Sequence, residues 1–288
     1  EFIPVIEPVR ESLSGLRRTL AAVCDAGGRA IVIVNPYHGD HQEDGIGITD
    51  LLQEDFKDFD NISAGILLRT DMTVDAVMAC YGQHVDHHPV LIHAGFTAPK
   101  VLAVELREGM SGLTNIFVED YANTLYRKHF EGSTRILIRD GFKRRKNSEF
   151  AKIPVEEFSE LHLTFQSDLG MSGFGDFLTV GDAYSDGGGP AYAVAIHLTF
   201  IDPNADEVMR IYHFVSTTND TPTDPAGKFA QALAKLIEKL DGGASHILET
   251  SAIQEFRGLH AKGHFPGLGY VKKLSMKHHI ETLAAYLN

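Results

Sequence analysis

The sequence has few cysteines and no long apolar run, and both absences narrow the class of protein. Its 288 residues include only two cysteines, Cys24 and Cys80, each inside an apolar helical pattern. Two such residues give no disulfide framework and are typical of reduced thiols in the cytoplasm. No apolar stretch approaches the roughly 18 residues of a membrane-spanning helix, and no signal peptide is recognisable. We therefore predict a cytoplasmic protein with no membrane partner.

Positive charge is also scarce. The chain has 26 Lys and Arg residues against 39 Asp and Glu, which gives a formal net charge of -13. A uniformly acidic surface repels phosphate backbones, so binding of nucleic acid would need a local basic patch.

The chain begins without Met and has no lead-in to its first apolar run, so we expect further residues before Glu1.

Apolar runs alternate with helical segments through the first half of the chain. Six of these runs have the length of strands: Phe2–Val5, Ala30–Val34, Ala64–Leu68, Val90–Ile92, Asn115–Val118 and Arg135–Ile138. Strand–helix units in this order imply parallel strands joined by right-handed crossovers. The strands are continuously apolar, which indicates a sheet covered on both faces.

Two folds fit this pattern, an open doubly wound sheet or a (β/α)8 barrel. No Gly-rich nucleotide loop follows any strand, which argues against a dinucleotide-binding sheet. We therefore predict an α/β fold, a single barrel-like domain over residues 1–288. Regular TIM-barrel-like (β/α) units are expected over 1–142, irregular antiparallel strands over 143–222 and a helical part over 223–288.

The second half shows turn and cap signals of a different kind. The stretch "IDPNADE" at 201–207 lies between two β-branched and aromatic runs and predicts a hairpin. Asp224 as N-cap, Pro225 in the first turn and Gly242 just past the end predict a helix. A further helix is expected in "MKHHIETLAAYLN", with the histidines of its "KHH" triplet, 277–279, at the surface.

Several motifs give the chain a family likeness: "VIEPV", "IVNP", "SGFGDFLTVGD", "GGPAYAVAIHLTFIDP", "HFVSTTNDTPTDPAGKF" and "HFPGLGYVKKLSMKHHIE". They resemble a bacterial family called beta-family proteins, in its sce-type branch, over nearly the whole chain. Genes of that family often lie on mobile islands beside a restriction-nuclease-like partner, which implies a role in phage defence. The resemblance brings no settled chemistry. The stretch "NPYHGDHQED" departs from the family pattern, in which the Asn-Pro and Gly-Asp elements recur without the two histidines.

Each of the six expected strands ends in a group able to do acid–base work or to hold an anion. In a parallel barrel, reactive side chains gather at these carboxyl ends. Carboxylates and imidazole are suited to proton transfer, and on this ground the candidate catalytic residues are Glu7, His93, Glu119 and Asp140. Arginine forks suit phosphate or carboxylate groups, and the candidate substrate-binding residues are Asn35, Arg69, Arg139, Asp176 and Asp182.

Alternatives to these roles follow from the same residues. Glu7–Arg69 and Arg139–Glu119 would also serve as ion pairs that only close the top of the barrel. Asp176 and Asp182 are expected six residues apart on one strand, facing the same way, although an aspartate beside glycine is usually a turn residue.

Two further groups suggest ligands. His38 and His41 stand three residues apart in a loop and are weak candidates for a divalent metal, because they match no compact signature. The basic cluster Lys143-Arg144-Arg145-Lys146 and the loop Lys262–Lys273, with its interleaved aromatic residues, could hold nucleic acid or a nucleotide. Solvated loops are the simpler interpretation of both basic stretches.

Two functions are compatible with the sequence. The first is a barrel hydrolase of a phosphodiester or nucleotide-like anion. The second is a non-catalytic sensor, or a partner-binding subunit of a two-gene defence system with a nuclease-like partner. The row of charged strand ends favours the first, and the lack of a sharp catalytic signature favours the second. Convergence of Glu7, Arg69, His93 and Asp140 on one pocket would distinguish them.

Overall fold

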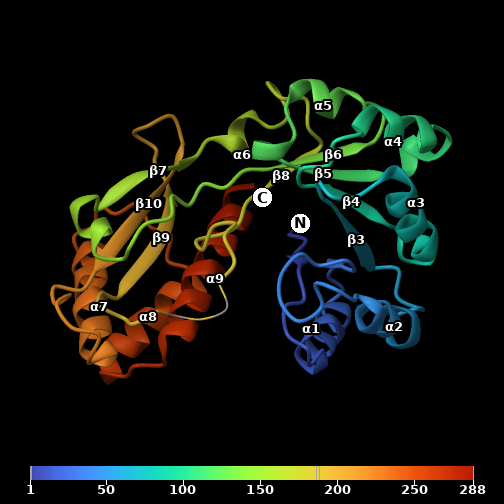
Figure 1. Cartoon of the computed structure of the whole chain (residues 1–288). Helices are drawn as coiled ribbons and strands as arrows, with labels where there is room; N and C mark the ends of the chain where they lie inside the picture. The colour runs from blue at the N-terminus through green and yellow to red at the C-terminus, as the bar shows by residue number, and fades with distance from the viewer. Residues whose placement is uncertain (1, 186, 188, 288) are drawn as a thin grey trace. The chain divides into compact units, whose positions relative to one another are not determined.

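The computed structural model describes residues 2–185, 187 and 189–287, which form two compact units (Figure 1). The first unit comprises the chain up to Arg139 together with Phe165–Gly175. The second comprises Asp140–Thr164 and the chain from Asp176 onward. The structure thus shows two units where the sequence predicted parts of one barrel-like domain, and the first boundary falls close to the expected change of character at residue 142.

The first unit is built on a curled parallel sheet (Figure 1). Its seven strands are, in order of pairing, β1 (Val5–Ile6), β2 (Ala30–Ile33), β3 (Ile62–Leu68), β4 (Val90–His93), β5 (Thr114–Val118), β6 (Thr134–Ile138) and β8 (Gly173–Gly175). Every neighbouring pair is parallel. The expected strands from Ala30 to Ile138 and their parallel direction are confirmed, whereas the expected run Phe2–Val5 overlaps β1 only at Val5.

Helices follow the strands around the outer side of this sheet (Figure 1). They are α1 (Ser14–Asp25), α2 (Ile46–Asp55), α3 (Val74–Gln83), α4 (Pro99–Glu105) and α5 (Thr124–Lys128), with the short turns η1 (Val85–His87), η2 (Arg107–Gly112) and η3 (Glu119–Tyr121). Ile31, Ile92 and Ile116 share one apolar cluster on one face of the sheet. The alternate residues Val32 and Leu91 are fully buried on the other face, so both faces are covered as predicted.

The sheet is a half-barrel. Within the described chain, β1 and β8 each pair on one side only, and a closed TIM barrel is therefore not formed by this sheet. Strand β8 lies in the region where antiparallel strands were expected, yet it pairs in parallel with β6 through Ile136 and Gly173. A three-residue strand with two glycines has no side-chain alternation from which its direction could be predicted.

The second unit holds an antiparallel sheet of three strands, β7 (Val155–Ser159), β10 (Met209–Val215) and β9 (Ala195–Ile201). Strands β9 and β10 form the predicted hairpin, with Ile201 opposite Met209. Helices α7 (Pro225–Asp241), α8 (Ser251–Lys262) and α9 (Leu268–Leu287) share an apolar cluster with this sheet. Phe142 and Phe150, the latter within η4 (Glu149–Lys152), pack with Ala195 and Val215 of the sheet. The short helix α6 (Leu161–Thr164) follows β7.

Helix α7 begins as predicted, because an Asp224 carboxylate oxygen accepts a hydrogen bond from the Gly227 N–H at 2.9 Å. The expected loop Lys262–Lys273 is wrong. Lys262 is the last residue of α8, and α9 starts at Leu268. The glycines that indicated a loop serve instead as a short link, in which Gly263 ends α8 with a φ of 57°.

Two further findings concern the cysteines and the membrane. Cys24 and Cys80 are free thiols, and burial raises the pKa of Cys80 to about 11. None of the helices in the described ranges has the length and apolar character needed to cross a bilayer.

The loop after β2 packs directly on the backbone of the loop after β1. Gly39 has a φ of +79°, and a Cβ at this position would lie 2.2 Å from the Val9 carbonyl oxygen. The N–H of the next residue, Asp40, donates to the same carbonyl at 3.3 Å. Glycine is required here both by its backbone angle and by the space available.

Gly39→Ala should therefore lower the free energy of unfolding by roughly 2 kcal/mol or more, because the new Cβ meets backbone that cannot move aside cheaply. Gly82→Ala is the matched control. It lies in α3 with nothing near its Cβ position and should raise stability by about 0.5–1 kcal/mol. Urea unfolding followed by circular dichroism measures both changes. Equal stability of Gly39→Ala and wild type would contradict the close contact.

Candidate functional site

The carboxyl ends of β1 to β6 lie along one edge of the first unit's sheet, because all its strands run in the same direction. Glu7 follows β1 and is held by the loop after β2. Its carboxylate accepts hydrogen bonds from the backbone N–H groups of Tyr37 and His38 at 2.6 and 2.9 Å. The Nδ1 atom of His38 lies 3.1 Å from the other carboxylate oxygen. Glu7 therefore fastens the first two strand ends together.

The metal hypothesis rests on His38 and His41, and the two histidines have different partners. His38 contacts Glu7, whereas Nε2 of His41 lies 3.0 Å from the Arg10 carbonyl oxygen. Over the described residues, no group of three or more His, Cys, Asp or Glu side chains is arranged to hold a metal ion. The structure thus gives no support to a metal at this loop.

Asn35 and Arg69 follow β2 and β3. The Asn35 side-chain amide donates to the Leu67 carbonyl at 2.9 Å and accepts from the Leu67 N–H at 2.8 Å, so it extends the pairing between these strands. Arg69 donates two hydrogen bonds to Asp71, at 3.1 and 3.2 Å, and a longer one to the Pro36 carbonyl. In place of the considered Glu7–Arg69 ion pair, the structure pairs each residue with a different partner.

Glu119 and Arg139 form the other considered ion pair, which the structure confirms. Arg139 Nη2 donates to one Glu119 oxygen at 3.0 Å, and Nε donates to the other. Two parallel bonds from a guanidinium to a carboxylate are a strong and geometrically specific arrangement. The pair joins the carboxyl ends of β5 and β6.

His93 is the last residue of β4, but its side chain enters the helix layer beside Tyr126. The imidazole is fully buried, with Nε2 2.9 Å from Asn115 Oδ1 and Nδ1 2.8 Å from the Tyr126 hydroxyl. It stacks on Phe117 at 4.6 Å between ring centroids, and burial lowers its pKa to about 4. A general base must reach the proton that it removes, so His93 is not part of the candidate site. Its side chain does not converge with Glu7 and Arg69 on one pocket, as the first hydrolase hypothesis required.

Asp140 opens the second unit and lies among the other predicted aspartates. Its carboxylate accepts hydrogen bonds from the Phe142 N–H at 2.8 Å and from the Asp182 N–H at 3.0 Å. Burial raises the pKa of Asp140, and the negative charges of Asp182 and Asp176 act in the same direction. Asp140 is only half-buried, so solvent reaches this unusually basic carboxylate.

Asp176 has the opposite environment. One carboxylate oxygen lies 2.9 Å from His279 Nε2, and the other accepts a hydrogen bond from the Leu178 N–H at 2.8 Å. Burial alone would raise the pKa of Asp176, but the charge and hydrogen bond of His279 outweigh it and the pKa is lowered. His279 is fully buried and is fixed from its other side by Thr199, whose Oγ1 lies 2.9 Å from Nδ1.

The expected strand between Asp176 and Asp182 is wrong, because residues 178–180 form a turn and Leu178 has a φ of 53°. The expected exposure of the "KHH" triplet is also wrong, since His278 and His279 are both fully buried. A signal for this was present in α9. Its buried residues Val271, Leu274, Ser275, His278, His279 and Thr282 recur at helical spacing.

The residues of the basic cluster Lys143-Arg144-Arg145-Lys146 have different surroundings. Arg145 donates to both oxygens of Glu156, one of them at 3.0 Å, and Lys143 lies 3.5 Å from the same carboxylate. The side chains of Lys143, Arg144 and Lys146 are exposed. Arg145 is therefore a structural residue, and the other three remain available at the surface.

A buried histidine pair continues inward from Glu156. His213 Nε2 lies 3.2 Å from Glu156, and its Nδ1 lies 2.7 Å from Nδ1 of His197. Burial lowers the pKa of His213 to about 4 and that of His197 to about 3, with the positive charge of Lys272 adding to the effect on His197. These rings stay neutral at physiological pH and serve as hydrogen-bonded core.

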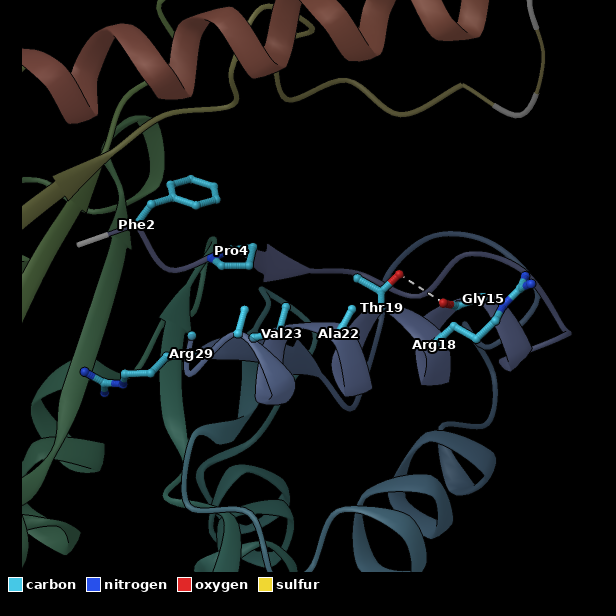
Figure 2. Close-up of a pocket in the computed structure, with 10 residues that line it drawn as sticks. Phe2, Pro4, Gly15, Arg18, Thr19, Ala22, Val23 and Arg29 are labelled. Atoms are coloured by element: carbon cyan, nitrogen blue, oxygen red, sulfur yellow. Dashed lines mark hydrogen bonds between the residues drawn. The ribbon is translucent and has the colours of Figure 1, made fainter. Parts of the chain in front are cut away.

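A groove of about 720 Å³ lies beside α1 in the first unit (Figure 2). Phe2, Pro4 and the exposed side of α1 line it, and its charged lining residues are Arg18 and Arg29. None of the predicted site residues belongs to its lining. The groove is therefore separate from the strand-end groups described above.

No protein-family model, curated protein or solved structure matches this chain. The likeness to beta-family proteins stays a prediction. Site geometry, together with that likeness, carries the functional conclusion.

The buried histidines predict acid sensitivity. His278 has a pKa lowered by burial to about 4, so the unfolded chain, with its pKa near 6.5, takes up protons first as the pH falls. Stability should therefore decrease between about pH 6.5 and 4, by on the order of 3 kcal/mol for His278 alone. Urea unfolding across this range measures the slope.

His278→Gln keeps a donor and an acceptor but does not titrate, so it should flatten that slope. His264→Gln, at an exposed position, is the control and should leave the slope unchanged. A wild-type slope in His278→Gln would show that this histidine is not responsible.

Proposed function

We propose that the protein is a phage-defence-associated hydrolase that cleaves a phosphodiester or nucleotide-like anion at Asp140 and Asp176. The observation that carries this proposal is the opposite pKa shift of these two neighbouring carboxyls, raised in Asp140 and lowered in Asp176. A pair of titratable groups whose environments separate their pKa values is the arrangement that assigns acid and base. The role in defence rests on the family likeness.

Asp140 is the proposed general acid. A carboxyl with a raised pKa keeps its proton to higher pH than an ordinary aspartate, and it can give that proton to a leaving oxygen. Its two backbone hydrogen bonds, from Phe142 and Asp182, fix its position. These donors hold the carboxyl from the protein side, while its partial exposure leaves a path to substrate.

Asp176 is the proposed general base. His279 and the Leu178 N–H hold it as a carboxylate, and the buried ring of His279 is positioned by Thr199. In the proposed reaction Asp176 takes a proton from water, the water oxygen attacks phosphorus, and the bond to the leaving oxygen breaks. Asp140 then supplies the proton to that oxygen, so the two carboxyls end with exchanged protonation.

Surface cations of the second unit suit the charge of such a substrate. Lys143, Arg144 and Lys146 follow Asp140 in the chain and are exposed. Lys272 lies seven residues before His279 on α9, which places it on the same side of the helix. Positive groups near a transferring phosphoryl group stabilise the charge that develops on its oxygens.

A second function, that of a non-catalytic sensor or a subunit bound to a nuclease-like partner, is favoured by the first unit. There the strand-end charges are engaged with each other, as in Arg69–Asp71 and Arg139–Glu119. Side chains engaged in such ion pairs are better suited to forming a binding surface than to transferring protons. For this unit we infer a TIM-barrel-type scaffold that presents its strand ends to a ligand.

Asp140→Asn should strongly reduce hydrolysis, because asparagine cannot supply the acid proton. Asparagine keeps only one of the two oxygens that accept from the Phe142 and Asp182 N–H groups, so some loss of stability is expected as well. The expected loss is about 10²- to 10⁴-fold in rate on the chromogenic diester bis(4-nitrophenyl) phosphate. Asp220→Asn, at an exposed position of the same unit, is the matched control and should retain full rate. Thermal unfolding confirms that both variants fold.

A phage challenge with the neighbouring gene present separates the two functions. The hydrolase predicts that Asp140→Asn loses protection and Asp220→Asn keeps it. Full protection by a folded Asp140→Asn variant would reject the hydrolase and leave the sensor.

A further inference from the structure

Two exposed tyrosines lie on the carboxyl edge of the first unit's sheet. Tyr37 follows β2 and is 52% exposed, and Tyr121 follows β5 in η3 and is 56% exposed. Soluble proteins expose single apolar residues everywhere, but these two rings stand on the same edge as the arginines and carboxylates described above. That combination of groups indicates a ligand that has both planar aromatic rings and charged groups.

The residues between the two tyrosines make a continuous row. The guanidinium of Arg69 lies 5.6 Å from the centre of the Tyr37 ring. The next residue, Thr70, donates its hydroxyl to the Gly95 carbonyl at 3.1 Å. Gly95, after β4, has a φ of +110°, and a Cβ there would lie 2.7 Å from Thr70 Oγ1 and 3.8 Å from the Tyr121 ring. Glycine at this position lets Thr70 and Tyr121 approach each other.

The spacing of the row follows from the sheet. Neighbouring strands lie about 4.8 Å apart, so the ends of β2 and β5 are separated by roughly 14 Å. One nucleobase does not span that distance, whereas a short single strand does. Arg69 is held by Asp71 through two hydrogen bonds. Because the Asp71 side chain is 70% exposed, solvent screens this pair and a phosphate can compete for the arginine.

We propose that this row, Tyr37–Arg69–Thr70–Gly95–Tyr121, is a stacking platform for the bases of single-stranded nucleic acid. Aromatic rings stack on bases of any sequence, and an arginine beside them takes the backbone phosphate. In a duplex the bases are stacked inside and the phosphates are the main groups available for contact. The net charge of -13 disfavours binding that depends mostly on phosphates. This role goes beyond the proposed function, and it rests on that function only for the phosphodiester class of the ligand, which it names as single-stranded nucleic acid.

The test is fluorescence anisotropy with a labelled oligo(dA) of about twelve nucleotides, with AMP and a duplex of the same length as competitors. Tyr37→Ala and Tyr121→Ala should each weaken binding on the order of 5- to 100-fold. Tyr37→Phe and Tyr121→Phe keep the ring and should bind as wild type does. Phe59→Ala removes an exposed aromatic ring before β3, at the other end of the strands, and is the matched control.

Four results would overturn the platform: no binding by the wild type, unchanged binding in both alanine variants, competition by AMP as effective as by the oligonucleotide, or preference for duplex. Binding that is lost only when Lys143, Arg144 and Lys146 are replaced would likewise place the contact elsewhere. Binding is measured both in wild type and in Asp140→Asn. A failed hydrolase assay together with intact, tyrosine-dependent binding would reject the proposed chemistry and keep the platform.

Discussion

Parallel pairing of every neighbouring strand is the constraint on which the first unit's edge depends. Because each strand runs the same way, the connections between β1 and β6 return over the outer side through helices, and the carboxyl ends reach one edge. The register then decides which residue faces which side, and a slip of one residue would exchange the two faces. His93 shows this at the end of β4, since it pairs with Leu68 and Phe117 in register but its ring enters the helix layer beside Tyr126.

The second unit depends on two adjacent histidines of α9. Neighbouring helix positions point about 100° apart, so His278 and His279 reach different elements. His278 lies 2.8 Å from both the Thr199 carbonyl and the Thr250 hydroxyl, and His279 joins Thr199 to Asp176. An imidazole can form hydrogen bonds through both of its ring nitrogens, and here both nitrogens of each ring are used. Strand β9, the start of α8 and the turn after Asp176 are thereby tied to one helix.

Local patterns were sufficient for the regular elements. The apolar runs predicted β2 to β6, and Asp224 with Pro225 predicted the start of α7. The predictions that were wrong concern residues whose structural partners lie far away in the sequence. Strand β8 is defined by its pairing with β6, and the link between α8 and α9 was taken for a long loop because its glycines dominate the pattern. His279 meets Asp176, 103 positions away, and no local signal identifies such a partner.

The strand ends also differ in what their carboxylates can do. Glu7 accepts two backbone N–H bonds and contacts His38, and Glu119 is held by both arms of Arg139. Their lone pairs are committed to groups that position other side chains, which suits them to build a binding edge. Asp140 accepts its hydrogen bonds from the backbone N–H groups of Phe142 and Asp182, and burial together with two neighbouring aspartates raises its pKa. These carboxylates therefore differ through their neighbours: Glu119 is paired with an arginine and Glu7 with a histidine and two backbone N–H groups, whereas Asp140 is half-buried beside two aspartates.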